Sequence, residues 1–209
     1  MATAGDEDRR AHWDHVHTTR AETDVSWFEE TPAVSLDLIR ATGIARDAAI
    51  IDIGGGASRL VDALLQEGYS ALTVLDVAEP ALATARARLG SRASAVRWIV
   101  ADVTAWAPDR TYAVWHDRAA FHFLTRTAER EAYVARVLRA LPAGGHLIIG
   151  TFAPDGPERC SGLPVLRYDA ASLAATLGRG FALVDTRPHE HHTPAGTVQR
   201  FQFSRFRRV

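Results

Sequence analysis

Four acidic side chains and a glycine triplet fall at points where predicted strands end. Asp52 precedes the triplet Gly54-Gly55-Gly56, and Asp76, Asp102 and Asp117 each close a later apolar run. Glycines accept positive φ and carry no Cβ, so a ligand can lie directly against the main chain at such a turn. A carboxylate at the end of the next strand, about twenty residues on, can accept hydrogen bonds from both hydroxyls of a ribose. The pattern therefore predicts a nucleoside-type ligand at one edge of a sheet.

The apolar runs that carry these acids have the length and branched residues of buried strands. They span residues 50–53, 71–75, 96–101, 112–116 and 146–152, and helical patterns at 59–67, 79–89 and 127–141 lie between them. Alternating strands and helices joined by right-handed crossovers form a parallel sheet with helices on both faces. A further helix at 170–177 and a hairpin of strands 181–185 and 197–205 follow. The sequence predicts an α/β fold.

The triplet does not match the dinucleotide-binding fingerprint, because Arg59 stands where the third glycine of Gly-x-Gly-x-x-Gly belongs. Together with the strand-end acids, the chain resembles the class I S-adenosylmethionine-dependent methyltransferases. Their motif acidic-x-Gly-x-Gly matches residues 52–56, and Asp76 and Asp102 match the acids on the ribose and adenine sides. The resemblance runs from about Ala48 to the C-terminus. It implies a three-layer, Rossmann-like, seven-stranded sheet, mostly parallel with one antiparallel strand.

The resemblance also implies a cofactor, S-adenosylmethionine, with S-adenosylhomocysteine as the product. By this resemblance, Gly54 and Gly56 allow the cofactor to approach the main chain closely, Asp52 positions its amino group, and Asp76 holds its ribose. The whole set expected to bind the cofactor is Trp27, Asp52, Gly54, Gly55, Gly56, Asp76, Val77, Asp102, Val103, Asp117 and Arg118.

Residues 1–47 are expected to form a helical segment that covers the active site, and residues 48–209 the methyltransferase domain, within one globular unit. Residues 1–8 are expected to be disordered, and helices are expected at 9–20 and within 23–40. Trp13 and Trp27-Phe28 resemble aromatic residues near the cofactor in the branch that contains citrate synthase lysine methyltransferase and elongation-factor lysine methyltransferases. Aromatic packing of the helices against the sheet is the alternative interpretation.

Methyl transfer from a sulfonium is an in-line displacement with an activated leaving group, so the enzyme chiefly positions the nucleophile and excludes water. We expect Asp117 to orient or deprotonate an amine and His122 to act as general base. A helix cap and a packed histidine are the alternatives for these two residues. A Pro/Gly-rich loop at 153–168 is expected to close over the acceptor. The side chains expected at the acceptor are Trp13, Phe28, His122, Cys160 and His192.

The histidine-rich run from His189 to His192 predicts no metal site. If the run is a strand, its side chains alternate between faces, so at most two histidines point to one place. The spacing of a closed tetrahedral site is also missing.

Composition narrows the class of protein. The chain has 209 residues, 47% of them hydrophobic, which suits one core. Its formal charge of −1 gives no field for nucleic acid, and Asp117-Arg118-Ala119-Ala120 differs from the Pro-Pro-aromatic signature of DNA amino-methyltransferases. A single cysteine suits a reducing cytosol, and no run of apolar residues is long enough to span a membrane. All 24 cationic residues are arginine, which indicates a GC-rich bacterial genome. We expect a cytoplasmic monomer or dimer.

The resulting hypothesis is a methyltransferase that transfers a methyl group from S-adenosylmethionine to a nitrogen, sulfur or metalloid atom of a small-molecule acceptor. A protein-lysine methyltransferase is the first alternative, and it is less favoured because the chain offers no extended acidic face for docking a protein. An NAD(P)-dependent reductase and a non-catalytic nucleotide-binding module are the remaining alternatives.

Overall fold

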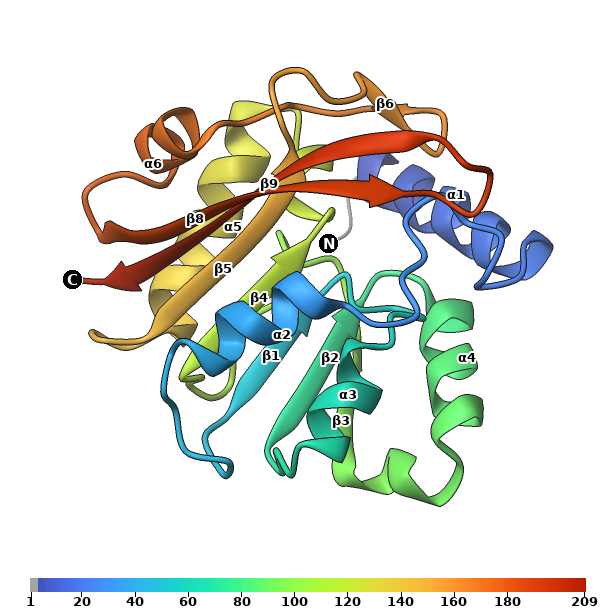
Figure 1. The fold of residues 1–209 in the computed structure, drawn as a ribbon, viewed down its shortest axis with the longest axis horizontal. Coiled ribbons are helices and arrows are strands. Elements are labelled where there is room, and N and C mark those ends of the chain that lie inside the picture. The colour runs from blue at the N-terminus through green and yellow to red at the C-terminus, as the bar shows by residue number, and fades with distance from the viewer. Residues whose placement is uncertain (1–3) are drawn as a thin grey trace.

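The computed structural model describes residues 4–209 and is built around one seven-stranded sheet (Figure 1). Its strands are β1 (Ile50–Ile53), β2 (Leu72–Asp76), β3 (Val96–Val100), β4 (Val114–Arg118), β5 (His146–Phe152), β8 (Phe181–His192) and β9 (Val198–Arg208). They lie in the order β3-β2-β1-β4-β5-β9-β8. Strand β9 runs antiparallel to β5 and β8, and the pairs among β1 to β5 are parallel. The predicted fold is confirmed.

Helices cover both faces of the sheet. On one face lie α2 (Ala33–Arg40), α3 (Leu60–Gln66) and α4 (Glu79–Leu89), and on the other α5 (Thr127–Ala140) and α6 (Ala170–Leu177). Figure 1 shows α2 and α3 in front of the sheet and α5 behind it. Successive strand residues point to opposite faces, so Ile50 joins the first core and Ile51 the second. Two short 3-10 helices, η1 (Gly90–Ala95) and η2 (Phe121–Phe123), complete this part.

The N-terminal segment differs from its prediction. Helix α1 (Ala4–Thr19) begins within the stretch expected to be disordered, and residues 1–3 of that stretch lie outside the described residues. The second helix, expected within residues 23–40 with Pro32 near its start, is α2, which begins at Ala33 directly after Pro32. A proline disfavours the helical conformation of the residue before it, so the helix cannot extend backwards through Thr31. The intervening residues form turns and extended segments.

The C-terminal strands are longer than predicted. Strand β8 continues past Pro188 to His192, and β9 continues to Arg208. Strand β8 is at the edge of the sheet, where a proline costs no hydrogen bond to a neighbouring strand. The loop that follows β5 also contains a small hairpin, β6 (Arg159–Cys160) with β7 (Leu163–Pro164), where no regular structure was expected.

Crossing a membrane requires a long and apolar helix, and the helices of residues 4–209 can be judged by both properties. None of them is both long enough and apolar enough to cross one.

Candidate functional site

Two adjoining cavities lie where β1, β2 and β4 end. Both are lined by His17, Trp27, Gly54, Asp76 and Arg118. One of them, which we call the cofactor cavity, also contains Asp52 and the rest of the glycine turn. The other, which we call the aromatic cavity, also contains Trp13, Val77, Asp102, Val103 and Cys160. Parallel strands end at one edge of a sheet, so the predicted strand-end residues are brought together as expected.

The glycine turn leaves no room for side chains. Gly54 and Gly56 have positive φ, at 65° and 33°. A Cβ on Gly54 would lie 2.7 Å from the Cβ of Ala120, and one on Gly56 would lie 2.8 Å from Asp76 Oδ2. The amides of Gly54 and Gly55 donate to the Leu75 carbonyl at 2.8 and 3.3 Å, which ties the turn to β2. The bare main chain is therefore a rigid surface against which a ligand can lie.

Asp76 is a buried carboxylate beside that turn. Its Oδ1 accepts a hydrogen bond of 2.8 Å from the Ala78 amide. Burial raises the pKa of Asp76 to about 7, and the nearby negative charge of Asp52 adds to the rise. A buried carboxylate of this kind gains most from new hydrogen-bond donors. The hydroxyls of a ribose are such donors, so this residue fits the predicted nucleoside.

Asp52 is oriented by a chain of hydrogen bonds that the sequence analysis missed. His116 Nδ1 lies 2.7 Å from Asp52 Oδ1, and His116 Nε2 lies 2.9 Å from Ser35 Oγ. All three side chains are buried and come from β1, β4 and α2. The only hint in the sequence was a histidine inside an otherwise apolar strand. The network fixes the carboxylate at the position from which it can accept a hydrogen bond from an amino group.

Asp102 is already occupied by protein partners. Its Oδ1 accepts from the amide and hydroxyl of Thr104, at 2.7 and 2.6 Å, and its Oδ2 pairs with Arg9 at 2.6 Å. Arg9 also pairs with Glu129. The predicted contact with an adenine amine therefore competes with an ion pair from α1 that no local pattern reveals.

Helix α1 supplies one wall of the aromatic cavity. Arg9, Trp13 and His17 are spaced four residues apart, so they share one face of the helix, and all three line the cavity. The Trp13 ring makes edge contacts with Trp27 and Phe123, at centroid distances of 5.7 and 5.1 Å. Neither His17 nor Phe123 was among the predicted site residues.

Phe28 and Cys160 lie at opposite ends of the site. Phe28 lines the cofactor cavity with Arg59 over its ring, and Cys160 lines the aromatic cavity. Burial raises the pKa of the Cys160 thiol to about 11. The thiol is therefore protonated at neutral pH and is a packing group rather than a nucleophile.

Asp117 and His122, the two residues expected to be catalytic, are buried beneath the cavities and line neither of them. Asp117 is 0% exposed, and it accepts from the amides of Ala120 and Phe121 and from the hydroxyl of Tyr133 at 2.9 Å. Strand β4 extends to Arg118, so Asp117 points to the α5 face while His116 and Arg118 point to the cavities. Burial raises the pKa of Asp117 to about 6. This geometry corresponds to the alternative interpretation, a cap of the turn after β4.

His122 is also 0% exposed. Burial, together with the charge of Arg118, lowers its pKa to about 3. Its Nδ1 lies 3.5 Å from the Phe152 amide, and its ring packs against Phe123 and Phe152. The geometry again corresponds to the alternative interpretation, a packed and neutral histidine.

Arg118 and His192, the last two predicted residues, have different surroundings. Arg118 is partly buried, donates to the Trp27 carbonyl at 2.9 Å and pairs with Glu29 at 3.1 Å, so it joins β4 to the N-terminal segment. His192 is exposed and lies outside both cavities, while His189 and His191 turn towards Glu29.

The comparisons with known proteins agree with this geometry. Residues 50–145 match the family model described as a methyltransferase domain. A comparison with curated protein sequences finds no match.

Three solved structures have the same fold at low sequence identity. A SAM-dependent methyltransferase from Anabaena variabilis is 13% identical, with a TM-score of 0.77 over 100% of this chain and 96% of that chain. An enzyme studied for the conversion of a disulfide bond into a thioacetal group during echinomycin biosynthesis is 20% identical, with a TM-score of 0.75 over 95% and 92%. Burkholderia thailandensis 1,6-didemethyltoxoflavin-N1-methyltransferase, bound to its substrate and S-adenosylhomocysteine, is 21% identical, with a TM-score of 0.69 over 100% and 92%.

The predicted enzyme class is confirmed by the match to a methyltransferase domain, whose residues 50–145 include β1 to β4 and the glycine turn. The predicted cofactor agrees with the S-adenosylhomocysteine bound in the last of these structures.

Proposed function

We propose that this methyltransferase transfers the methyl group of S-adenosylmethionine to a nitrogen or sulfur atom of a small acceptor held in the aromatic cavity. The observation that carries the proposal is the adjacency of the two cavities, which share Gly54, Asp76 and Arg118 as a common boundary. One cavity offers the groups that suit a nucleoside with an amino-acid tail. The other offers aromatic walls that suit an apolar acceptor.

The chain's own groups would hold the cofactor as follows. The glycine turn admits it against the main chain, Asp76 accepts from the ribose hydroxyls, and Asp52 accepts from the amino group. Val77 and Val103 line the aromatic cavity, so the adenine end would extend across the shared boundary into the part of that cavity beside them. When bound, S-adenosylmethionine supplies an activated sulfonium methyl group. The protein then has to orient the acceptor and exclude water.

His17 is the base that the geometry offers in place of Asp117 and His122. It lines both cavities, and its ring lies 6.2 Å from that of Trp27. Burial lowers the pKa of His17, so the imidazole is neutral at pH 7 and its lone pair can take a proton from the acceptor. A neutral base beside apolar walls suits an amine or a thiol.

The size of the acceptor is the finer part of the proposal. Trp13, Trp27 and Phe123 close over the aromatic cavity, which favours a molecule small enough to be enclosed. The echinomycin and toxoflavin structures concern small acceptors. Protein lysine is the competing acceptor, since Trp13, Trp27 and Phe28 carry the resemblance to the lysine-methylating branch and all three line the cavities.

Calorimetric titration tests the cofactor part. We expect S-adenosylhomocysteine to bind with one site, and NAD and NADP to produce no heat. Binding of a nicotinamide cofactor alone would overturn the proposal in favour of a reductase, and binding of S-adenosylhomocysteine without turnover of any acceptor would favour a non-catalytic nucleotide-binding module.

A methyl-transfer screen tests the acceptor. Aromatic and aliphatic amines, thiols and metalloids are compared with a whole-cell protein lysate, using a labelled methyl group. We expect label in small molecules and a pH–rate profile whose fall on the acidic side, where His17 becomes protonated, disappears in His17→Gln. Label in protein bands would overturn the small-molecule acceptor and favour lysine.

The remaining parts of the proposal concern the state of the enzyme in the cell. We propose that it is a cytoplasmic bacterial enzyme that acts without nucleic acid, as a monomer or dimer. Size-exclusion chromatography with light scattering measures the last of these directly, and a tetramer or larger assembly would contradict it.

A further inference from the structure

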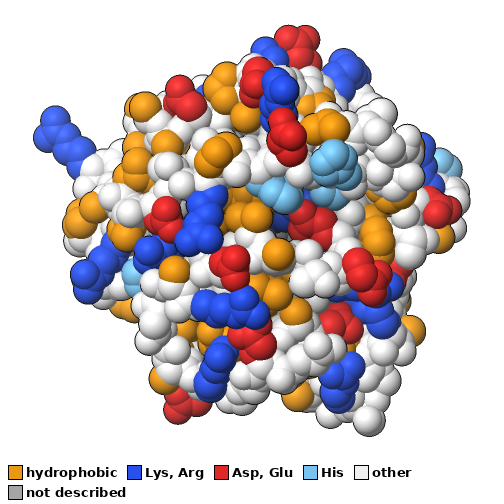
Figure 2. All heavy atoms as spheres, viewed as in Figure 1, with side chains coloured by type: hydrophobic (Ala, Val, Ile, Leu, Met, Phe, Trp, Pro, Cys, Tyr) orange, Lys and Arg blue, Asp and Glu red, His pale blue; other side chains and the backbone are white. Residues whose placement is uncertain are grey.

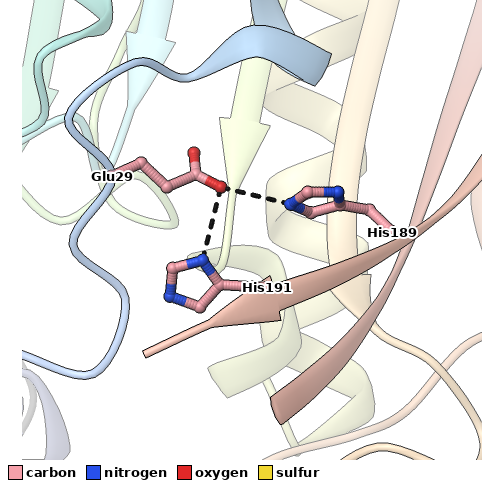
Figure 3. Close-up of side chains that lie close together, drawn as sticks. All are labelled: Glu29, His189 and His191. Atoms are coloured by element: carbon pink, nitrogen blue, oxygen red, sulfur yellow. Dashed lines mark ion pairs between the residues drawn. The ribbon is translucent and has the colours of Figure 1, made fainter. Parts of the chain in front are cut away.

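A second cluster of reactive side chains lies beside the cofactor cavity and shares Glu29 with its lining. Glu29, from the segment before α2, faces His189 and His191 of β8 (Figure 3). Glu29 Oε1 lies 3.4 Å from His189 Nε2 and 3.5 Å from His191 Nδ1, and the three ligand atoms all lie within 4.8 Å of one another. Two imidazole nitrogens and a carboxylate oxygen form a typical donor set for a transition metal.

The spacing of the three atoms suits a tetrahedral ion. Zinc binds imidazole nitrogen and carboxylate oxygen at about 2.0–2.2 Å, so two ligands at tetrahedral corners lie roughly 3.3–3.5 Å apart. The distances from Glu29 Oε1 to the two histidine nitrogens, 3.4 and 3.5 Å, fall in this range. Both are longer than a direct N–H···O hydrogen bond, which is about 2.9 Å.

The tautomer of His191 supports the same interpretation. Its Nε2 lies 2.7 Å from the carbonyl oxygen of Ser26, which can only accept a hydrogen bond. Nε2 must therefore carry a proton, and in the neutral ring Nδ1 then turns a lone pair towards the Glu29 carboxylate. Either a proton on Nδ1 or a metal ion between the two atoms relieves the repulsion of the facing lone pairs, and their separation of 3.5 Å is longer than a hydrogen bond through a proton. A metal-bound histidine commonly donates its other ring N–H to a backbone carbonyl in this way.

The surroundings are partly open. The cluster lines a shallow hollow together with Phe28, Glu30 and Glu190, so a fourth position is within reach of water. Figure 2 shows histidine side chains beside acidic ones on this face, where Figure 1 draws the β8–β9 hairpin. Arg118, whose Nη2 lies 3.1 Å from Glu29 Oε1, opposes a cation, and the nearby carboxylates of Glu30 and Glu190 are each paired with an arginine, Arg59 and Arg200.

We propose that Glu29, His189 and His191 bind one divalent transition-metal ion of the zinc class, with water at the fourth position. The ion would fasten the segment of Trp27 and Phe28, which lines both cavities, to the edge strand of the sheet. The site borders the cofactor cavity through Glu29, but its test measures metal binding and does not depend on the proposed acceptor.

The test uses tag-free, chelator-treated protein with zinc chloride and, separately, cobalt chloride. We expect one zinc ion per chain by competition with a chromophoric chelator, and a visible absorption band of four-coordinate cobalt. Glu29→Gln and His189→Ala should each weaken zinc binding by about 100-fold or more. His192→Ala is the matched control, because it removes an exposed histidine from the same run and should leave the affinity unchanged.

Two results would overturn the site. One is wild-type protein that binds no zinc at concentrations up to roughly 100 μM, well above the range of structural zinc sites. The other is zinc binding that survives both substitutions or is lost in His192→Ala, which would place the ion elsewhere. Because Glu29→Gln removes only the charge, circular dichroism of that variant separates loss of a ligand from loss of the fold.

Discussion

The glycine turn and the N-terminal cap, which we define as residues 4–32, border the same cavities but are held in different ways. The turn is fixed by backbone hydrogen bonds to Leu75 and by close contacts that leave no space for a Cβ. The cap is joined to the rest of the chain by apolar contacts of Val16, Val25 and Trp27 and by five ion pairs, Arg9–Asp102, Arg9–Glu129, Glu22–Arg59, Glu22–Arg88 and Glu29–Arg118. The turn is therefore preorganised, while the cap can be released by disrupting charged contacts.

The two regions are held by contacts that differ in how easily they are disrupted. Backbone packing costs several kcal/mol to distort, whereas partly exposed ion pairs are screened by salt and contribute little each. The turn can therefore be tested by adding a Cβ, and the cap by removing a charge. The predictions below separate the two regions, beginning with the largest expected effect.

Gly54→Ala should produce the largest loss, because it breaks the preorganised region. Its positive φ costs about 1–2 kcal/mol for any L side chain, and the new Cβ would lie 2.7 Å from Ala120 Cβ. We expect the free energy of unfolding to fall by about 3 kcal/mol in total, with loss of S-adenosylhomocysteine binding. Denaturant unfolding and calorimetry measure both quantities.

Gly43→Ala is the matched control for that change. Its φ of 69° is close to the 65° of Gly54, yet a Cβ there would meet nothing within 4 Å. This variant should lose only the cost of the positive φ and keep its cofactor affinity. Equal losses in the two variants would show that the turn is not specially packed.

Asp76→Asn should weaken cofactor binding by roughly 100-fold, since hydrogen bonds to a charged group contribute about 1.5–3 kcal/mol each. Without ligand the same change should stabilise the fold. The pKa of Asp76 rises from 3.8 to about 7 on folding, so the folded state binds the extra proton and wild-type stability falls as pH rises between these values. The advantage of Asn over Asp should thus grow from pH 4 to pH 7 and then stay constant.

The same titration predicts how cofactor binding depends on pH. Only the ionised carboxylate can accept from both ribose hydroxyls, so wild-type affinity should fall by up to about tenfold per unit as pH drops below 7. Calorimetry between pH 5 and pH 8 measures this, and Asp76→Asn should remove the slope. A pH-independent affinity in the wild type would contradict the assignment of Asp76 to the ribose.

Arg9→Ala tests the cap and should have a smaller effect. It leaves Asp102, which is 9% exposed, without its cation, and it breaks the pair with Glu129. We expect a loss of about 1–3 kcal/mol and faster proteolysis of residues 4–32, with the glycine turn intact. Arg97→Ala is the control, because its pair with Asp109 is exposed and should contribute little. Unchanged proteolysis in Arg9→Ala would show that the cap is not held by this contact.

Cys160→Ser should have the smallest effect. The pKa of the thiol is raised to about 11 by burial, so almost none of it is thiolate at pH 8. We expect iodoacetamide to react with the folded wild type far more slowly than with unfolded protein, and cofactor affinity to be the same in Cys160→Ser. Rapid alkylation of the folded protein would mean that the loop around β6 opens freely.

The sequence determined the parts of this protein that depend on local pattern. Asp52, Asp76 and the glycines could be placed because short branched runs form strands, glycine permits the turn, and parallel strands must end at one edge. The same reasoning located α5, α6 and β5 to within a residue. The predicted strand at 112–116 begins two residues before β4, which spans Val114–Arg118. Because the prediction ended the strand before Asp117, it did not assign that side chain to a face of the sheet.

The tertiary structure alone decided which partners the functional side chains have. Arg9 meets Asp102, Ser35 meets His116, and Glu29 meets His189, in each case across many residues of chain. Such contacts depend on where whole helices and strands pack. Packing is driven mainly by the burial of apolar surface, which does not specify which charged residues become neighbours. For this reason the cofactor edge was predictable from the sequence, while the ion pairs of the cap, the position of His17 beside both cavities and the Glu29–His189–His191 cluster were not.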